Sequence, residues 1–259
     1  MFLSREEFSH SFTDGTVVFE DIAASLRVLE KNSIRWIQLD EHYLQAAMDT
    51  DEPSRPVFAY VQAMMMSLVM GSEPRSLLNL GIGGGAVERF VTRHLPGCDI
   101  VSVELNADVL SAARRYFALP ESVKVIEADA FEYLQQTAEQ YDLICVDLFG
   151  SDGCQDRLLE ESLWLSLYER MHFTGCLVVN LLLTEQAVLL QVVTIIRQYF
   201  SHVVIFHMEG FENVVIYCRH YPCVVSEVLK KNADELADDW GLDFKTLLDH
   251  LTYLPEPFR

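Results

Sequence analysis

The 259-residue sequence has few basic residues and few long apolar runs. Its 19 Lys and Arg face 39 Asp and Glu, which gives a formal net charge of −20 at pH 7. Such a surface repels nucleic-acid phosphates and anionic membranes and attracts polycationic small molecules, although many acidic chains owe their charge to solubility alone. The longest uncharged apolar run of the first hundred residues, 57–70, is shorter than the roughly 20 residues of a membrane-spanning helix. We therefore expect no nucleic-acid partner and no membrane partner.

Signals for export, metal binding and serine-hydrolase chemistry are also missing. Charged residues come directly after Ser4, ahead of any apolar run, so the sequence indicates no signal peptide. The six cysteines form no Cys-x-x-Cys pair near histidines, which favours reduced thiols and argues against a metal site. No Gly-x-Ser-x-Gly turn follows an expected strand. We therefore expect a cytoplasmic protein that holds no metal.

Three short runs rich in β-branched and aromatic residues, 16–19, 25–29 and 34–39, open the chain. Polar turns separate them, which predicts a small antiparallel meander. Two prolines follow within 49–56, and then the apolar run 57–70 predicts a buried helix whose methionines fill the core. We predict a small N-terminal β domain over residues 1–52.

From Ser76 onward, apolar strand runs alternate with helical stretches. These runs are 77–80, 100–103, 123–126, 143–146 and 177–181. Alternation of this kind predicts βαβ units and a mainly parallel sheet. The last two runs, 202–207 and 214–218, have so short a link that they must form an antiparallel hairpin. The predicted fold is α/β, with a Rossmann-like nucleoside-binding domain over 53–222, a seven-stranded sheet and a helical, acidic tail over 223–259.

The first of these strands runs into a glycine cluster that precedes a helix. Gly81, Gly83 and Gly85 would let the backbone turn tightly and let a ligand approach the helix N-terminus. The next strand ends in Glu104, which is placed to accept hydrogen bonds from both ribose hydroxyls of a bound nucleoside. The alternative is that Glu104 serves the N-terminus of the helix that begins near Asn106.

Two more acids follow later strands. Asp129, with Ala130 after it, stands where the third strand meets a helix, and it can either accept from an adenine amino group or cap that helix. Asp147 ends the fourth strand at the carboxyl edge of the sheet, where open α/β folds bind ligands. An acid after so apolar a run needs a partner or a chemical role.

Together these segments resemble the spermidine synthase (polyamine aminopropyltransferase) family of the class I S-adenosylmethionine-dependent methyltransferase fold, in its divergent spermidine synthase-like branch. The matching segments are 81–85, 103–106, 115–120, 129–130 and 141–147. The resemblance implies that the glycine loop and Glu104 hold an adenosyl donor, that Asp129 and Ala130 meet its adenine, and that Asp147 anchors or deprotonates a substrate amine.

The resemblance also implies the co-substrate and the partners. The co-substrate would be S-adenosylmethionine or its decarboxylated form, and the acceptor would be a small amine or polyamine. A homodimer is expected, with apolar residues of the small sheet, Trp36 among them, seating the second subunit.

The chain departs from the family pattern at two acids. Gly84 stands where the family's glycine loop carries an Asp that grips the donor amine, and Gly150 stands where a second sheet-edge Asp is expected. Asp152 is a candidate to replace the acid missing at 150. In the family a Tyr-His pair opens the helix that comes after the small β domain, and here only its tyrosine is matched, by Tyr60, since Val61 follows it.

Three hypotheses remain open on the sequence. The first is an aminopropyltransferase-like enzyme, with Asp147, Asp152 and Tyr60 as catalytic candidates. The second is a small-molecule methyltransferase, because a site without the donor-amine acid suits a donor that keeps its own carboxylate. The third is a catalytically silent nucleoside-binding homologue, which the losses at 84 and 150 favour.

Overall fold

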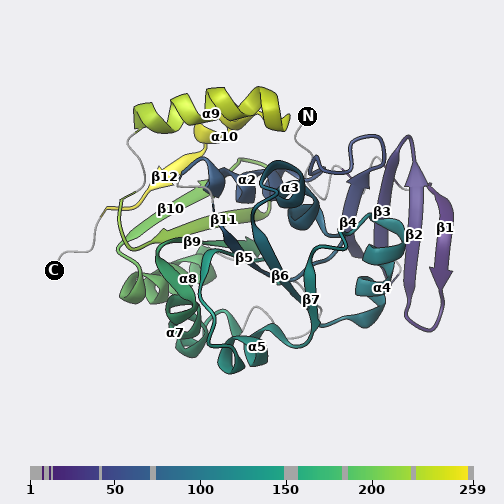
Figure 1. Ribbon diagram of the computed structural model, residues 1–259, viewed down its shortest axis with the longest axis horizontal. Helices are drawn as coiled ribbons and strands as arrows, with labels where there is room; N and C mark the ends of the chain where they lie inside the picture. Colours follow the sequence, from purple (N-terminus) through teal and green to yellow (C-terminus); the bar gives the residue numbers. More distant parts are fainter. Residues whose placement is uncertain are drawn as a thin grey trace.

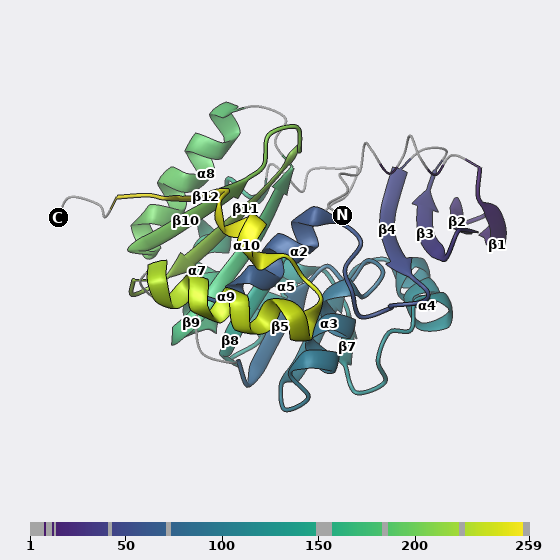
Figure 2. The same cartoon turned by 90° about the horizontal axis from the view of Figure 1, so that it is seen from above.

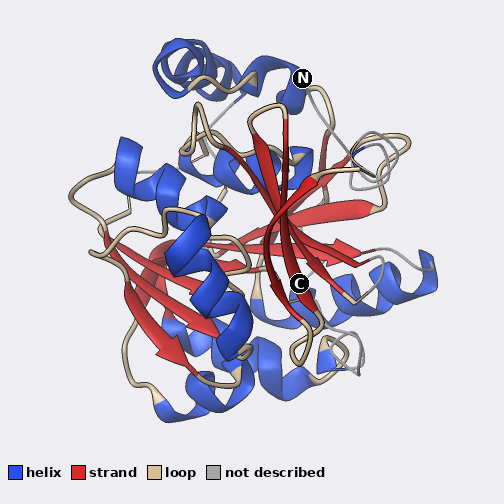
Figure 3. Ribbon diagram, turned by 90° about the vertical axis from the view of Figure 1, so that its right-hand side faces the viewer, coloured by secondary structure: helices blue, strands red, loops and turns tan. Residues whose placement is uncertain are grey.

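The strands of the protein form two separate sheets. The structure, a computed structural model, describes residues 8, 12, 14–40, 43–70, 74–148, 157–182, 186–222 and 226–255. Within these ranges one sheet has four strands and the other has eight. Figure 3 shows the strands gathered into these two groups, with helices between and around them.

The small sheet is an antiparallel meander in the order β1-β2-β3-β4. Its strands are β1 (Thr16–Asp21), β2 (Leu26–Lys31), β3 (Ile34–Leu39) and β4 (Tyr43–Asp49). The predicted meander is confirmed, and β4 extends it by one strand that the sequence did not indicate. Figure 2 shows the small sheet beside α4 (Ala107–Tyr116), at the end of the molecule opposite the C-terminus.

Trp36 is not on the surface of this small sheet, which corrects the expectation that it seats a second subunit. Its side chain is 3% exposed and packs edge-on against the ring of Phe8, 5.7 Å away between centroids. The apolar residues that the sheet does expose lie on its edge strand β1, where Val17 is 50% exposed and Val18 is 41% exposed.

The large sheet has the order β12-β10-β11-β9-β8-β5-β6-β7. Its strands are β5 (Ser76–Leu80), β6 (Asp99–Glu104), β7 (Lys124–Glu127), β8 (Tyr141–Val146), β9 (Met171–Leu182), β10 (His202–His207), β11 (Asn213–Arg219) and β12 (Leu251–Tyr253). The pairs from β7 to β9 are parallel, and β10 and β11 form the predicted antiparallel hairpin. The predicted fold is confirmed, with β12 as an eighth strand supplied by the tail.

Helices cover both faces of the large sheet. One face carries α2 (Ala59–Met65), α3 (Ala86–His94), α9 (Ser226–Trp240) and α10 (Phe244–Leu248), and the other carries α5 (Ala130–Gln136), α7 (Glu161–Arg170) and α8 (Gln186–Tyr199). Figure 1 shows α9 and α10 above α2, on the side away from α7 and α8. Successive residues of β5 divide between the faces: Leu77 packs with the first group and Leu78 with the second.

The run 57–70 is buried, as its composition predicts. Met64, Met65 and Met66 are 0% exposed and belong to the core that α2 shares with the large sheet. The helix ends at Met65, and a 3-10 turn, η1 (Met66–Leu68), continues it. Among the described helices, none combines the length and the apolar character that crossing a bilayer requires.

Candidate functional site

The loop between β5 and α3 bends sharply at its glycines. Gly81, Gly83 and Gly85 have φ values of +95°, +51° and +75°, a region that residues with a side chain rarely adopt. At Gly81 a Cβ would also lie 2.3 Å from the backbone oxygen of Asp147, which is too close for any side chain. Glycine at this position therefore allows the end of β8 to touch the loop and brings Asp147 into the site.

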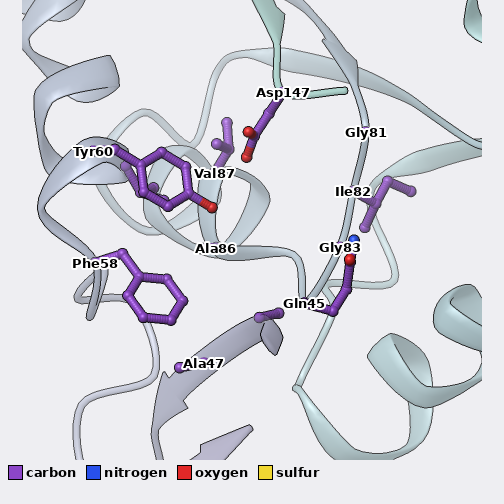
Figure 4. Close-up of a pocket in the computed structure, with 13 residues that line it drawn as sticks. Gln45, Ala47, Phe58, Tyr60, Gly81, Ile82, Gly83, Ala86, Val87 and Asp147 are labelled. Atoms are coloured by element: carbon purple, nitrogen blue, oxygen red, sulfur yellow. The ribbon is translucent and has the colours of Figure 1, made fainter. Parts of the chain in front are cut away.

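A small pocket opens beside this loop at the carboxyl edge of the sheet. Its lining comes from β4, α2, the loop, the start of α3 and the end of β8: Gln45, Ala46, Ala47, Phe58, Tyr60, Val61, Gly81, Ile82, Gly83, Gly84, Ala86, Val87 and Asp147. In Figure 4 the carboxylate of Asp147 and the hydroxyl of Tyr60 both point toward it. The pocket is open on one side, and the centre of a water-sized group can move through about 30 Å³ of it.

Asp147 is oriented by two buried asparagines. Its Oδ1 accepts a hydrogen bond of 2.8 Å from Asn180 Nδ2 in β9, and Asn180 Oδ1 in turn accepts from Asn213 Nδ2 in β11 at 3.1 Å. Asn180 is 2% exposed and Asn213 is 6% exposed. Neither asparagine was predicted from the sequence, although the amide of Asn180 inside the apolar run of β9 was a signal for such a role.

Tyr60 enters the pocket from α2. Its ring is buried and stacks on that of Phe58, with centroids 5.9 Å apart and planes at 15°. Stacking fixes the ring, so its hydroxyl end is directed toward the pocket (Figure 4). Tyr60 and Asp147 therefore line the same pocket, and their catalytic roles stay predictions.

Glu104 ends β6 beneath the same loop, with its carboxylate among backbone amides. Oε2 accepts from the N–H groups of Ile82 (3.0 Å) and Gly83 (3.1 Å), and Oε1 accepts from that of Asn106 (3.0 Å). The cap of α4 is Asn106 itself, whose side chain accepts from Asp108 and Val109. A carboxylate has about four acceptor positions, so these three bonds leave one for a ligand. For Glu104 to accept hydrogen bonds from both ribose hydroxyls, one of these three backbone N–H groups would have to give up its bond to the carboxylate.

Asp129 serves α5 as its N-cap. Its Oδ1 accepts from the N–H groups of Phe131 (2.8 Å) and Glu132 (3.1 Å), while Oδ2 pairs with Arg157 at 2.8 Å. Burial raises the pKa of the Asp129 carboxyl, but these bonds and Arg157 outweigh it and hold the pKa below its ordinary value. Asp129 therefore caps α5, which is one of the two roles that the sequence predicts for it. Ala130 is buried as the first residue of α5, and adenine contact by this pair stays a prediction.

Gly84 is packed against the small sheet. A Cβ there would lie 2.7 Å from the Cβ of Ala46 in β4 and 3.3 Å from the ring of Phe117. An aspartate at this position would therefore require β4 to move. Beside it, the amide of Gln45 reaches the loop near Gly83 (Figure 4). Neither Gln45 nor Ala46 was predicted to lie at the site, because the strand β4 that carries them was not predicted.

Arg89 holds the loop from behind. Its Nε donates to Pro53 O at 2.6 Å, and its Nη1 donates to Phe117 O at 2.7 Å and to Gly84 O. Burial lowers the pKa of this guanidinium to about 10, so it stays charged at neutral pH. The buried Arg89 side chain thus connects, through hydrogen bonds, the segment before α2, the glycine loop and the end of α4.

Two positions that the sequence singles out lie outside the described residues. These are Gly150 and the candidate acid Asp152. Within the described ranges, no group of three or more His, Cys, Asp or Glu side chains is placed to hold a metal ion.

The sheet order, the glycine loop and the carboxylates at the sheet edge define a protein of the class I S-adenosylmethionine-dependent methyltransferase fold. The model of the spermine/spermidine synthase domain matches residues 58–222, and the chain belongs to this family.

The chain is also similar to individual proteins. The chain is 30% identical to the polyamine aminopropyltransferase of Chromobacterium violaceum over 233 residues, which cover 87% of this chain and 88% of that one. It is 28% identical to the eEF1A lysine and N-terminal methyltransferase of Danio rerio, over 63% of this chain and 26% of that protein. The crystal structure of a probable spermidine synthase from Corynebacterium glutamicum superimposes with a TM-score of 0.75 at 15% identity, over 94% of this chain and 91% of that one, and shares the fold.

Proposed function

We propose that the protein transfers an aminopropyl group from decarboxylated S-adenosylmethionine to an amine of a polyamine. The observation that carries this proposal is the Asp147 carboxylate, which is directed into a pocket beside the glycine loop and held by Asn180. Family membership and the aminopropyltransferase relatives support it. The net charge of −20 would attract a polycationic acceptor.

The reaction requires a neutral amine in line with the carbon next to a sulfonium. The amine nitrogen forms the new C–N bond, the C–S bond breaks, and its electron pair returns to sulfur as methylthioadenosine leaves. Asp147 would hold the amine in place and accept the proton that the nitrogen loses. Tyr60, fixed by Phe58, would contact the same end of the substrates.

The donor would lie across the sheet edge with only its reactive end in the pocket. The lining of the pocket supports this arrangement, because it includes Asp147 and Tyr60 but neither Glu104 nor Asp129. The ribose would reach the open acceptor position of Glu104, and the adenine would lie toward Asp129 and Ala130.

Methyl transfer from S-adenosylmethionine is a second candidate, and Gly84 favours it. Gly84 itself offers no carboxylate to pair with a donor amine, and its packing against Ala46 and Phe117 leaves no space there for one. A donor that carries its own carboxylate needs no such partner. The methyltransferase among the relatives supports the same candidate.

Two assays separate these candidates. The protein is incubated with putrescine and decarboxylated S-adenosylmethionine, and methylthioadenosine is measured by chromatography. Calorimetry then compares methylthioadenosine with S-adenosylhomocysteine as ligands. Aminopropyl transfer predicts turnover and tighter methylthioadenosine binding, whereas methyl transfer predicts no turnover and the reverse order. Binding of both nucleosides without turnover of either sulfonium donor would instead indicate the silent homologue.

The organisation of the protein is part of the proposal. We infer three segments, 1–52, 53–222 and 223–259, in a cytoplasmic homodimer. The exposed valines of edge strand β1, Val17 and Val18, support a contact between subunits through the small sheet. Light scattering of the purified chain measures the oligomeric state, and a monomer at micromolar concentration would contradict this inference.

A further inference from the structure

Three polar side chains are sealed in the interior behind the glycine loop. They are Asn79 of β5, Glu88 of α3 and Ser102 of β6, which are 1%, 0% and 0% exposed. Glu88 Oε1 accepts from Asn79 Nδ2 at 2.6 Å and from Ser102 Oγ at 2.7 Å. Asn79 Nδ2 also donates to the carbonyl of Gly81 at 3.2 Å. The cluster therefore connects a buried acid to the first residue of the loop.

Two acceptor atoms of this cluster receive no hydrogen bond among the described residues. Both N–H groups of Asn79 are used, one for Glu88 and one for Gly81, and Ser102 has given its only proton. Glu88 Oε2 and Asn79 Oδ1 have no hydrogen-bond partner among the described residues, and both atoms are buried. A buried acceptor without a donor is costly, and here two such acceptors belong to side chains that already bond to each other.

A single proton shared between these two atoms would satisfy both acceptors. We propose that Glu88 is a neutral carboxylic acid whose Oε2–H donates to Asn79 Oδ1 and that, through Asn79, it positions the glycine loop at Gly81. The acid and the amide then form a closed ring of two hydrogen bonds, Nδ2–H to Oε1 and Oε2–H to Oδ1. Glu88 is a positioning residue, because it acts on the loop through Asn79 and not on the donor.

The surroundings of Glu88 agree with a neutral acid. Burial raises the pKa of its carboxyl, and the bonds from Asn79 and Ser102 together with Arg89 oppose this only in part. Arg89, the neighbouring cation on α3, directs its N–H groups to three backbone carbonyls. Cys145 of β8 also interacts with Glu88, and burial raises the pKa of this thiol well above its ordinary value, so it adds no charge at neutral pH.

The proton has a consequence for stability. In the unfolded chain this carboxyl ionises near its ordinary pKa of 4.5, whereas in the folded chain it keeps its proton to higher pH. The folded state then binds more protons than the unfolded state in that window, so stability falls as the pH rises through it. The full contribution is present below pH 4.5 and is lost once the folded carboxyl ionises.

Glu88→Gln tests the assignment because a glutamine imitates the neutral acid. Its Nε2 can donate to Asn79 Oδ1 while its Oε1 keeps both accepted bonds. We expect the variant to fold, and its Tm minus the wild-type Tm to grow with pH above 4.5. We also expect the wild-type infrared spectrum at pH 7 to contain a protonated carboxyl stretch that Glu88→Gln removes. The matched control is Glu121→Gln, at an exposed glutamate, which should change neither measurement.

Binding of S-adenosylhomocysteine tests the effect on the loop, and this part rests on the proposed function. Its Kd should weaken in the wild type as Glu88 ionises and stay constant in Glu88→Gln, with the two proteins within about twofold at pH 6. A variant that fails to fold, a Tm difference independent of pH, or no protonated carboxyl stretch would each overturn the proposal. If S-adenosylhomocysteine and methylthioadenosine bind neither protein at any pH, the proposed function fails while the infrared and Tm results still decide the state of Glu88.

Discussion

The glycine loop has two sides that differ in how their polar groups are used. On the pocket side, Asp147 is the one carboxylate among the described lining residues, and most of the rest are small or apolar. On the buried side, Arg89 and Asn79 donate to carbonyls of the loop, and Asn79 also donates to Glu88. The shape of the loop is therefore set from behind, whereas the proposed chemistry relies on the one described acid in front. Substitutions on the two sides should separate stability from activity.

The largest effect should come from Asp147→Asn. The amide can still accept from Asn180 Nδ2, so the pocket keeps its shape, but it can no longer take a proton or hold a cationic amine. We expect turnover of decarboxylated S-adenosylmethionine to fall by about 10²-fold or more. Methylthioadenosine production measures this.

The same variant should leave the free energy of unfolding within about 0.5 kcal/mol of the wild type, as for substitutions that break no buried contact. Nucleoside affinity should be equally unaffected, because Glu104 and Asp129 remain. Undiminished turnover in Asp147→Asn would remove Asp147 from the reaction and with it the basis of the proposed function.

Arg89→Met should have the next largest effect, on stability. The change keeps an unbranched apolar chain but removes the cation that satisfies the carbonyls of Pro53, Gly84 and Phe117. We expect the free energy of unfolding to drop by about 3 kcal/mol or more, since loss of a buried charged donor leaves its acceptors unpaired. Urea denaturation with an unchanged m-value would measure it, and a loss under about 1 kcal/mol would show that water can replace the guanidinium.

The pocket side was predictable from the sequence to a greater extent than the buried side. Glycines after a strand and acids at strand ends are local signals, because the carboxyl ends of parallel strands meet at one edge. They located the loop, Glu104 and Asp147, and the strand alternation gave the order of elements around them. The pairing of Asp129 with Arg157 needed a contact across 28 residues, which no local pattern encodes.

The residues of the site that were not predicted from the sequence all act across long separations. Asn180 and Asn213 reach Asp147 through two neighbouring strands, and Ala46 approaches Gly84 from another sheet. Arg89 lies in a helix whose charged residues would ordinarily face solvent. Its partners are backbone carbonyls, so side-chain patterns could not reveal them. The asparagines required knowledge of strand pairing within the large sheet, and Ala46 required knowledge of how the two sheets pack together.

Gly84→Ala tests the contact between those sheets and should have an intermediate effect. Gly84 is outside the positive-φ region, so the cost arises from the 2.7 Å approach to the Ala46 Cβ and not from backbone strain. We expect the free energy of unfolding to fall by about 1–3 kcal/mol, as in other overpacked sites. Ala46→Gly in the same chain should restore part of this loss, and a double-mutant cycle measures the coupling. Additive effects would mean that β4 does not limit the size of residue 84.

The smallest effect should come from Arg27→Met, which provides the exposed counterpart to Arg89. Arg27 donates from Nε to Glu20 Oε1 at 2.6 Å, a shorter distance than most of the hydrogen bonds that hold the glycine loop, yet the two side chains are 51% and 39% exposed. Because water solvates both charges when the pair breaks, we expect a change of about 0.5 kcal/mol or less in the free energy of unfolding. Raising the salt concentration should shrink even this difference, whereas the effect of Arg89→Met should persist. Equal losses at the two arginines would mean that Arg89 owes its effect to its charge alone and not to its burial among backbone carbonyls.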